Sequence, residues 1–462
     1  MKRTLIKSLL QEAKQDQSAY ICGWVKSKRQ SKNFAFLVIN DGSSQKDFQL
    51  IVDEGVPAFA MLEKCQTGAA IGAQGVIKKS QGKEQAWEMK VDQLKVFGEA
   101  PVETYPLQKK GHSLEFLREI GHLRPRTNTF GAVFRVRNEL AMAIHNFFQS
   151  RGFYWAHTPI LTANDCEGAG EMFQVTTLDL KNPPKSPKGD IDFTKDFFGK
   201  PAHLTVSGQL NGEAMAMAMG NIYTFGPTFR AENSNTTRHL SEFWMIEPEM
   251  AFYELKDNMI LAEEFLKEVF SEVVRRCPNE IAFFAEHYEG FTAEALTGLA
   301  TKPFAKISYT DAVKELEKSK ADFQFPVKWG IDLQTEHERY LTEKIFNSPV
   351  IVFDYPKDIK AYYMKQNPDG KTVAAMDVLA PKIGEIIGGS QREDDYEKLL
   401  ARVKQVGIKP EELQWYLDLR KFGGAPHAGF GLGFERLIQY VTGMSNIRDV
   451  IPFPRAPQTI AF

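Results

Sequence analysis

The densest group of charged side chains lies in residues 228–243, which read TFRAENSNTTRHLSEF between two strand-like apolar runs. Arg230 stands at the end of the first run, where a fixed guanidinium can grip a carboxylate or a phosphate through two hydrogen bonds. Arg238 and His239, at the far end of the same loop, are expected to close over more distal phosphates. Although an arbitrary charged hairpin is usually a solvated loop, this one predicts an anion site.

A second group, residues 424–437, reads GAPHAGFGLGFERL and predicts a glycine-rich turn that leads into a helix. Neither of the two common phosphate-binding loop motifs of nucleotide sites is present. The Walker pattern fails because Lys365 occupies the position of its first glycine, and no GxGxxG follows a strand. Arg436, at the start of the final helix, therefore becomes the candidate for contact with ATP.

The third group lies in residues 375–394, which read AMDVLAPKIGEIIGGSQRED. Asp377 and Glu385 flank an apolar strand, and Arg392 is expected to follow a turn at residues 388–390. Two carboxylates placed in this way can share a hard cation that bridges phosphate oxygens. The pair gains weight as a cation site because a buried strand at residues 385–387 carries one of the two acids.

These groups need elements that position them. Four short strand-like runs with turn signals between them predict a small N-terminal β barrel: residues 20–25, 34–40, 48–52 and 70–78. A basic stretch at 104–126 reads as a connector. Apolar residues at steps of three and four then predict a helix that starts near residue 127 and ends before Gly152: Val133, Val136, Leu140, Ile144 and Phe147.

The rest of the chain alternates strands and helices without regular βαβ units, so we expect an α+β fold and not a doubly wound parallel sheet. The 462 residues, 43% of them hydrophobic, suffice for two or three domains. A net charge of −2 excludes a global positive field, so any RNA site must be local. Four irregularly spaced cysteines, no signal sequence and no long apolar run predict a cytoplasmic protein outside the membrane.

Order and spacing of these segments resemble the class II aminoacyl-tRNA synthetases. Residues 228–243 resemble their motif 2, residues 429–437 their motif 3, and the helix at 127–151 with the strand ending at Pro159 their motif 1. The barrel is similar to the OB-fold anticodon domain of the aspartate, asparagine and lysine subgroup. The resemblance implies an anticodon domain at 1–103, a hinge at 104–126 and a catalytic domain at 127–462, built on an antiparallel sheet flanked by helices.

This resemblance implies ATP and Mg²⁺ as cofactors and assigns roles to the residues. Arg230 is expected on the α-phosphate and the amino-acid carboxylate, with Arg238 and His239 near the γ-phosphate. Phe243 and Arg436 are expected to sandwich the adenine.

The same resemblance places Asp377 and Glu385 on the metal. Glu167 and Gln209 are expected to reach the ammonium and carboxylate groups of the amino acid. It also implies a homodimer that forms through motif 1.

Within the subgroup, residues 328–341, 354–364 and 384–394 resemble the asparagine-specific branch, which implies L-asparagine and tRNA(Asn) as substrates. In residues 207–213, which read SGQLNGE, Gly212 replaces a lysine that aspartate-specific members carry. Arg392 is then the expected donor to the side-chain carbonyl of asparagine. Glu232, which strand alternation places on the same face as Arg230, is the expected acceptor for its NH₂. An aspartate-specific enzyme and an RNA-binding paralogue without activity are the alternatives.

In the barrel, the subgroup uses an aromatic residue to stack the central anticodon base, with an arginine and a glutamine that read base edges. Phe36, Arg29 and Gln49 occupy these positions here. From the strand pattern alone, Phe36 would be a core residue. One segment has no expected role: the proline-containing insertion at 178–200, which reads as an exposed loop.

Overall fold

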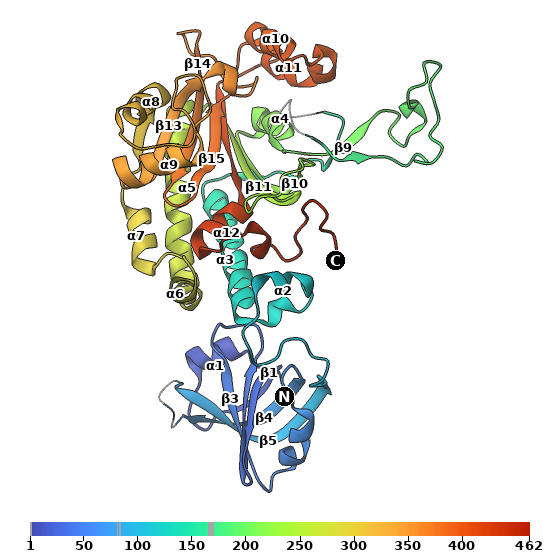
Figure 1. Ribbon diagram of the computed structural model, residues 1–462, viewed down its shortest axis with the longest axis vertical. Helices are drawn as coiled ribbons and strands as arrows, with labels where there is room; N and C mark the ends of the chain where they lie inside the picture. The colour runs from blue at the N-terminus through green and yellow to red at the C-terminus, as the bar shows by residue number, and fades with distance from the viewer. Residues whose placement is uncertain (1, 81, 83–84, 165–170) are drawn as a thin grey trace. The chain divides into compact units, whose positions relative to one another are not determined.

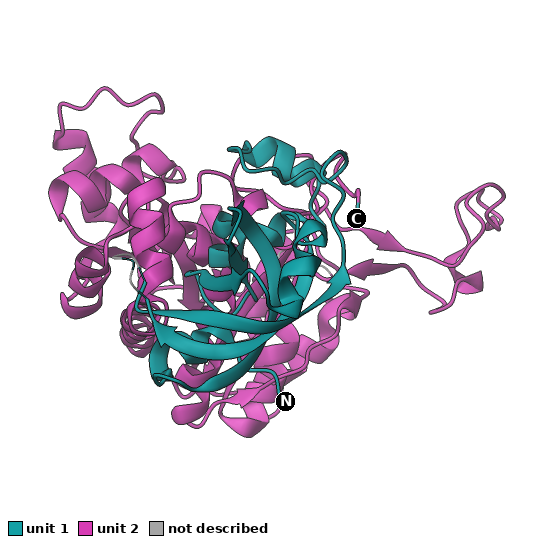
Figure 2. Ribbon diagram, turned by 90° about the horizontal axis from the view of Figure 1, so that it is seen from below, with its two compact units in different colours: residues 1–134, 462 teal, residues 135–461 magenta. Residues whose placement is uncertain are grey.

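The structure is a computed structural model that describes residues 2–80, 82, 85–164 and 171–462. The chain forms two compact units, Met1–Phe134 with Phe462, and Arg135–Ala461 (Figure 2). Among the described residues, no helix combines the length and apolar character needed to cross a membrane.

The first unit contains a closed five-stranded barrel in the order β1-β2-β3-β5-β4. Alternation along β2 places Ala35, Leu37 and Ile39 in the core and leaves Phe36 on the outer face. Asp41 accepts a hydrogen bond from the backbone N–H of Ile6 at 3.0 Å, which fixes the short N-terminal helix α1 against the barrel. The elements are α1 (Ile6–Glu12), β1 (Ser18–Gln30), β2 (Phe34–Asn40), β3 (Phe48–Asp53), η1 (Pro57–Lys64), β4 (Ala70–Lys79) and β5 (Trp87–Gly98).

The predicted barrel is confirmed, and four of its strands lie where the sequence placed them. The fifth strand, β5, was not predicted separately. Only Met89, Val91 and Glu88 are buried along it, and its pairing with β4 shifts register at two points. Its hydrophobic alternation is therefore too weak to stand out in the sequence.

The basic stretch after the barrel is more than a connector, which corrects the prediction. It contains α2 (Leu114–Glu119) and η2 (Arg124–Arg126), and Leu107, Leu117 and Phe130 form a small core there. The guanidinium of the fully buried Arg124 lies 4.3 Å from the ring centroid of Phe130. The domain boundaries expected at residues 103 and 126 stay predictions.

The predicted long helix is α3 (Asn128–Ser150), and all five apolar residues that predicted it are fully buried. The second unit is built on an eight-stranded sheet in the order β12-β13-β14-β15-β16-β11-β10-β6 (Figure 1). Only the β12–β13 and β10–β6 pairs are parallel. The strands are β6 (Tyr154–Trp155), β10 (Asn221–Phe229), β11 (Glu242–Ala251), β12 (Ala305–Ser308), β13 (Val350–Pro356), β14 (Thr372–Ala380), β15 (Gly384–Gln391) and β16 (His427–Gly433).

Helices flank this sheet and confirm the α+β class. α5 packs on β14, β15 and β16, whereas α4 packs on β10 and β11. The helices are α4 (Gln209–Met219), α5 (Leu255–Arg276), α6 (Pro278–His287), α7 (Ala293–Thr301), α8 (Tyr309–Lys318), α9 (Thr335–Tyr340), α10 (Tyr396–Gln405), α11 (Gln414–Lys421) and α12 (Phe434–Thr442).

An arm, residues 176–201, projects from the second unit (Figure 1). It starts from a small sheet of β7 (Leu161–Thr162), β9 (Ala202–Leu204) and β8 (Gln174–Val175). Asp196 holds its base because it accepts hydrogen bonds from the Thr176 hydroxyl at 2.6 Å and the Thr177 backbone at 2.9 Å. These bonds lower the pKa of Asp196 to about 2. The predicted exposed loop is thus an anchored projection.

Candidate active site

All three predicted groups contribute residues to one pocket of about 160 Å³, here called the arginine pocket. The β10–β11 hairpin supplies one wall, and β15, β16 and the start of α12 supply the other. All five residues predicted for the nucleotide line this pocket, together with Glu232 and Glu385: Arg230, Arg238, His239, Phe243 and Arg436.

Arg436 is positioned by the junction between β16 and α12. The preceding residue, Glu435, is buried; it pairs with Arg137 at 2.7 Å and accepts the Trp244 backbone N–H at 2.9 Å. These contacts fix the first turn of the helix. Arg436 then projects into the pocket and donates to the backbone carbonyl of Glu385 at 3.1 Å.

The far end of the motif-2 loop is anchored through Arg238. Its guanidinium donates to the Thr335 hydroxyl at 3.2 Å and to the Ile383 carbonyl at 3.3 Å. Burial, followed by the positive charge of Arg436, lowers the pKa of Arg238 and that of His239. This crowding of cationic groups gives the pocket a field suited to a polyanion.

Arg230 and Glu232 lie beyond the end of β10, which corrects the expectation that strand alternation places them on one face. Both nevertheless line the pocket. Thr228 pairs with Phe243 across the hairpin, and the Arg230 guanidinium lies 5.4 Å from the Phe243 ring centroid. The loop therefore brings a planar cation and an aromatic face to the same ligand space.

The β14–β15 hairpin carries the predicted metal ligands. Asp377 and Glu385 approach each other across Gly388, where an added Cβ would lie 3.0 Å from the Glu385 carboxylate and 3.5 Å from that of Asp377. Burial, followed by repulsion from Asp377, raises the pKa of Glu385. Lys360 opposes this repulsion because its ammonium donates to Asp377 at 2.6 Å.

A third acid, Glu338 on α9, accepts the Glu385 backbone N–H at 3.1 Å. Burial and the charge of Glu385 raise the pKa of Glu338 to about 8. Among the described residues, no group of three or more acidic, histidine or cysteine side chains has a metal-holding arrangement. The pair of carboxylates still fits Mg²⁺, which typically uses one or two protein carboxylates and completes its shell with phosphates and water.

Two other predicted residues belong to a buried ion cluster, defined here as Arg392, Arg420, Glu213 and Glu249. Arg392 holds Glu249 through two hydrogen bonds at 2.5 and 3.2 Å, and Arg420 pairs with Glu213 at 2.8 Å. Gln209, on α4, donates to Glu213 at 3.0 Å. Gly429 permits this packing, because a Cβ there would lie 2.4 Å from the Glu249 carboxylate.

The cluster is charge-balanced when both carboxylates are ionised. Burial opposes ionisation of Glu213, but Arg420, His427 and Arg392 hold its pKa below the ordinary value. Burial raises the pKa of Glu249, while the two-pronged contact with Arg392 favours its ionised form. Two arginines thus face two glutamates in a space taken out of water.

The structure changes two expectations about Arg392. Residues 388–390 lie inside β15 and do not form a turn, so Arg392 follows the end of that strand. Arg392 and Glu232 are also not brought together, because Glu232 lines the arginine pocket and Arg392 belongs to the ion cluster. Glu167 lies outside the described residues.

On the barrel, β1, β2 and β3 place the three predicted anticodon residues on the outer face. Arg29 pairs in register with Phe36, and Gln49 lies opposite Val38 on the next strand. Phe36 is half-buried against Phe34 at 5.1 Å between ring centroids. Its ring is therefore not part of the barrel core, and Gln49 is oriented by donating to Glu88 at 3.1 Å.

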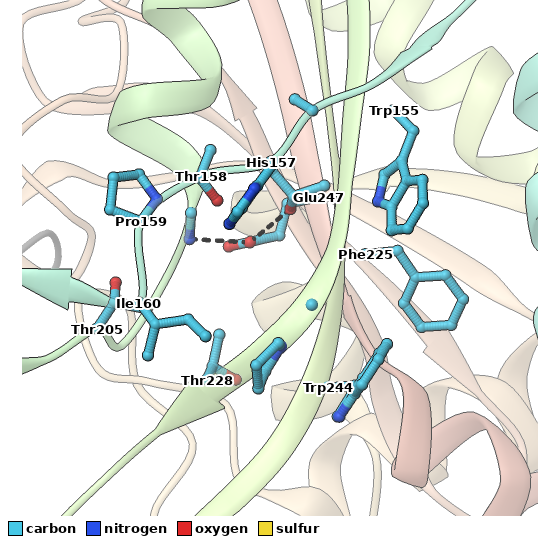
Figure 3. A pocket seen from close by; sticks show the side chains of 15 residues that line it. Trp155, His157, Thr158, Pro159, Ile160, Thr205, Phe225, Thr228, Trp244 and Glu247 are labelled. Carbon is cyan, nitrogen blue, oxygen red and sulfur yellow. Dashed lines mark hydrogen bonds between the residues drawn. The ribbon is translucent and has the colours of Figure 1, made fainter.

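A separate apolar cavity of about 400 Å³ lies at the β6 edge of the sheet (Figure 3). Trp155, Phe225 and Trp244 form one wall, and Glu247 accepts from the Gly208 backbone at 3.0 Å and the Thr224 hydroxyl at 2.8 Å. The predicted nucleotide and metal residues do not line it. Its chemistry suits an apolar surface and not a charged substrate.

Sequence reasoning missed Lys360, Glu338, Glu213 and Glu249. The first three lie in segments already singled out: residues 354–364, 328–341 and 207–213. Gly212 was interpreted as a lost lysine without weighing Glu213, its neighbour. Nothing in the sequence indicates a role for Glu249, because its ion-pair partner Arg392 becomes its neighbour only when the strands of the sheet are assembled.

Comparison with known proteins agrees with this geometry. The family described as tRNA synthetases class II (D, K and N) matches residues 113–457, and the OB-fold nucleic acid binding domain matches residues 19–97. The asparagine–tRNA ligase of Nostoc sp. is 58% identical over 458 residues, 99% of each chain. That of Cytophaga hutchinsonii is 59% identical over 464 residues, 100% of each chain.

Among solved structures, asparaginyl-tRNA synthetase from Pyrococcus horikoshii complexed with asparaginyl-adenylate is similar with a TM-score of 0.87. It is 32% identical in sequence, and the match covers 100% of this chain and 99% of that one.

Lys360→Met tests the electrostatics of the β14–β15 hairpin. The variant is expected to lose about 3 kcal/mol of unfolding free energy, because breaking a largely buried pair leaves Asp377 uncompensated. Urea denaturation measures the loss, with Lys357→Met as control, because the half-buried Lys357 donates to the Gly370 carbonyl and not to a carboxylate. Adding Asp377→Asn should recover much of the stability. Equal stability of the Lys360 and Lys357 variants would contradict this account.

Proposed function

The chain belongs to the class II tRNA synthetases of the D, K and N group, and from this premise we infer that it is an asparagine–tRNA ligase. It activates L-asparagine with ATP and transfers the asparaginyl group to tRNA(Asn), releasing pyrophosphate and AMP. The supporting observation is the arginine pocket, which gathers every predicted nucleotide residue in one fold with the charge-balanced ion cluster. Full-length similarity to asparagine–tRNA ligases favours asparagine over the aspartate alternative.

In the activation step, a carboxylate oxygen of asparagine attacks the α-phosphorus of ATP. The bond from that phosphorus to the bridging oxygen breaks, and pyrophosphate leaves with the electron pair. Such a step needs positioning and charge neutralisation more than covalent help. We assign the α-phosphate to Arg230, the distal phosphates to Arg238 and His239, and the adenine to the space between Phe243 and Arg436.

Asp377 and Glu385 are the residues that would hold Mg²⁺, with Lys360 limiting their repulsion in its absence. When bound, the ion neutralises charge on the phosphate oxygens. The hairpin itself contributes rigidity, because β14 is buried along its length and pairs with strands on both sides. The two carboxylates are therefore held in place before ATP arrives.

The ion cluster supplies the environment for the amino-acid side chain. When both of its carboxylates are ionised, the ion cluster has no net charge, which suits the neutral amide of asparagine. An additional cation in the cluster would favour the carboxylate of aspartate. We assign Arg392 to the side-chain carbonyl and keep Gln209 as a contact for the backbone groups of asparagine. Glu213 joins the earlier candidate Glu232 as a carboxylate that disfavours aspartate.

In the transfer step, the 3′-hydroxyl of the terminal adenosine of tRNA attacks the activated carbonyl, and AMP leaves. The outer face of the barrel, with Arg29, Phe36 and Gln49, is assigned to the anticodon. Because this reaction consumes ATP and tRNA, the cytoplasm is its proposed location. The three described cysteines, Cys22, Cys65 and Cys277, are free thiols.

We assign the apolar cavity at β6 to a homodimer contact. β6 is a two-residue edge strand, and Trp155 is 59% exposed on it. Ile160 and Trp244 add exposed apolar surface around the same cavity. An exposed edge with clustered aromatic surface is typical of a protein–protein contact, and the resemblance to motif 1 identifies a second copy as the partner.

Removing a donor from the arginine pocket should reduce activation directly. Arg230→Ala and Arg436→Ala are each expected to lower asparagine-dependent ATP–pyrophosphate exchange by about 10²- to 10³-fold, the typical effect of losing one preorganised donor. Circular dichroism should show an intact fold. Arg275→Ala, on the exposed face of α5, is the control, and near-normal exchange in either pocket variant would remove that residue from the site.

The barrel prediction separates tRNA recognition from activation. Phe36→Ala should lower kcat/KM for tRNA by about tenfold, because stacking contributes about 1–3 kcal/mol per base. Pyrophosphate exchange should not change. Phe97→Ala, which removes another exposed barrel ring, should leave both reactions intact. If exchange falls together with aminoacylation in the Phe36 variant, the ring is structural.

Amino-acid selection distinguishes the two candidate carboxylates. Glu213→Gln leaves Arg392 and Arg420 with one compensating charge fewer, so the ratio of kcat/KM for asparagine over aspartate should fall by about tenfold or more. Glu232→Gln should change the ratio less, because this side chain lines the nucleotide space. Thermal melts control for folding, and the reverse order of effects would assign discrimination to Glu232.

A further inference from the structure

A side cavity of about 340 Å³ lies outside the proposed active site, and none of the functions assigned above uses it. Its wall is formed by β7, the root of the arm, α4 and α11. The side chains that give it chemical character are Phe198 and Lys200 from the arm, Asn164 after β7, Asn211 from α4 and Trp415 from α11.

The side cavity is joined to the ion cluster through two helices. On α4, Gln209 and Glu213 contact each other at the ion cluster, while Asn211 lies between them in sequence and lines the side cavity. On α11, Tyr416 donates to Glu213 at 2.8 Å, and the preceding Trp415 lines the side cavity. One helix thickness, about 10 Å, therefore separates the two spaces.

The lining combines three chemical features. Trp415 offers a half-buried indole and Phe198 a ring that is 48% exposed. Asn211 has no hydrogen-bond partner for its side-chain amide among the described residues, and Lys200 has no ion-pair partner there. In the amide orientation that satisfies both neighbours, Asn164 accepts the Trp415 indole N–H at 3.0 Å and donates to the Glu412 carbonyl at 3.3 Å, which holds the indole in place.

Aromatic faces, an amide free to meet a base edge and a nearby cation are the features with which proteins hold single-stranded nucleic acid. We propose that the side cavity binds an unstacked base of the single-stranded 3′ end of tRNA, from one of the two nucleotides that precede the terminal adenosine. This proposal rests on the proposed function, because the ribose of the terminal adenosine must reach the activated carbonyl.

Position favours this occupant over a second copy of the chain. When the terminal ribose of the tRNA lies at the proposed amino-acid site, the two preceding nucleotides must lie close to that site. The side cavity is close to it, because only α4 and α11 separate the cavity from the ion cluster. The exposed Phe197 packs edge-to-face on Phe198 at 4.8 Å between ring centroids, which extends the aromatic surface outward along the arm. Stacking surfaces of this kind tolerate any base.

The test combines an enzyme variant with an altered tRNA. Trp415→Leu keeps apolar volume but removes the stacking face, and tRNA(Asn) carries an abasic residue at either of the two positions before the terminal adenosine. Trp415→Leu alone should lower kcat/KM for aminoacylation of unaltered tRNA by about tenfold. For the wild-type enzyme, an abasic residue at one of the two tRNA positions should cause a similar loss. The two together should cost no more than either alone, because both remove one contact.

Asparagine-dependent pyrophosphate exchange separates this proposal from the proposed function. Exchange by the wild type establishes the function, and its persistence in Trp415→Leu shows an intact active site. Asn211→Ala and Phe198→Leu provide further variants if Trp415→Leu fails to fold, and Phe422→Leu, an exposed ring just after α11, is the matched control. The proposal would be overturned if the losses from Trp415→Leu and from the abasic residue multiply at both tRNA positions. Unchanged aminoacylation by Trp415→Leu would also overturn it, as would a shift of this variant from dimer to monomer in sedimentation.

Discussion

The pairing of Arg392 with Glu249 is the interaction on which the geometry of the buried ion cluster depends. Removing either partner would leave a buried charge without compensation, which typically costs several kcal/mol. Glu249 belongs to β11 and Arg392 follows β15, so the pair crosses β16, where Gly429 leaves room for the carboxylate. Arg420 and Glu213 extend the same balance to α11 and α4. The result is a buried cluster of two arginines and two glutamates, charge-balanced when both carboxylates are ionised, between the sheet and its helices.

The arginine pocket follows the opposite principle. Arg238, Arg436 and His239 crowd together, and their mutual repulsion, which Glu338 and Glu232 offset only in part, favours a polyanionic ligand. The two spaces share β11, β15 and β16 as their common base. In the proposed function this arrangement separates the two substrates by charge, with ATP in the arginine pocket and asparagine at the ion cluster.

Much of the fold was predictable from the sequence, because hydrophobic alternation and helical periodicity are local signals. The helix α3 and the strands β2 and β10 are examples, whereas β5 was missed because few of its residues are buried. The residues expected at the nucleotide line one pocket, and their roles stay predictions. They were found because they lie in contiguous motifs, and the family resemblance is confirmed by the comparisons. The partners of Arg392, Glu213 and Asp377 were not predictable, because Glu249, Arg420 and Lys360 become their respective neighbours only through strand order and helix packing. Glu232 was placed by an alternation that ends with β10 at Phe229.

The measurement that tests the central claim most directly is ATP–pyrophosphate exchange by the wild-type chain with asparagine and with aspartate in parallel. A cationic pocket for ATP beside a charge-neutral cluster for the side chain predicts rapid exchange with asparagine and a kcat/KM for aspartate that is lower by orders of magnitude. Comparable exchange with both amino acids, or a preference for aspartate, would contradict the role of charge balance. Absence of exchange with either amino acid would contradict the assignment of the arginine pocket to ATP.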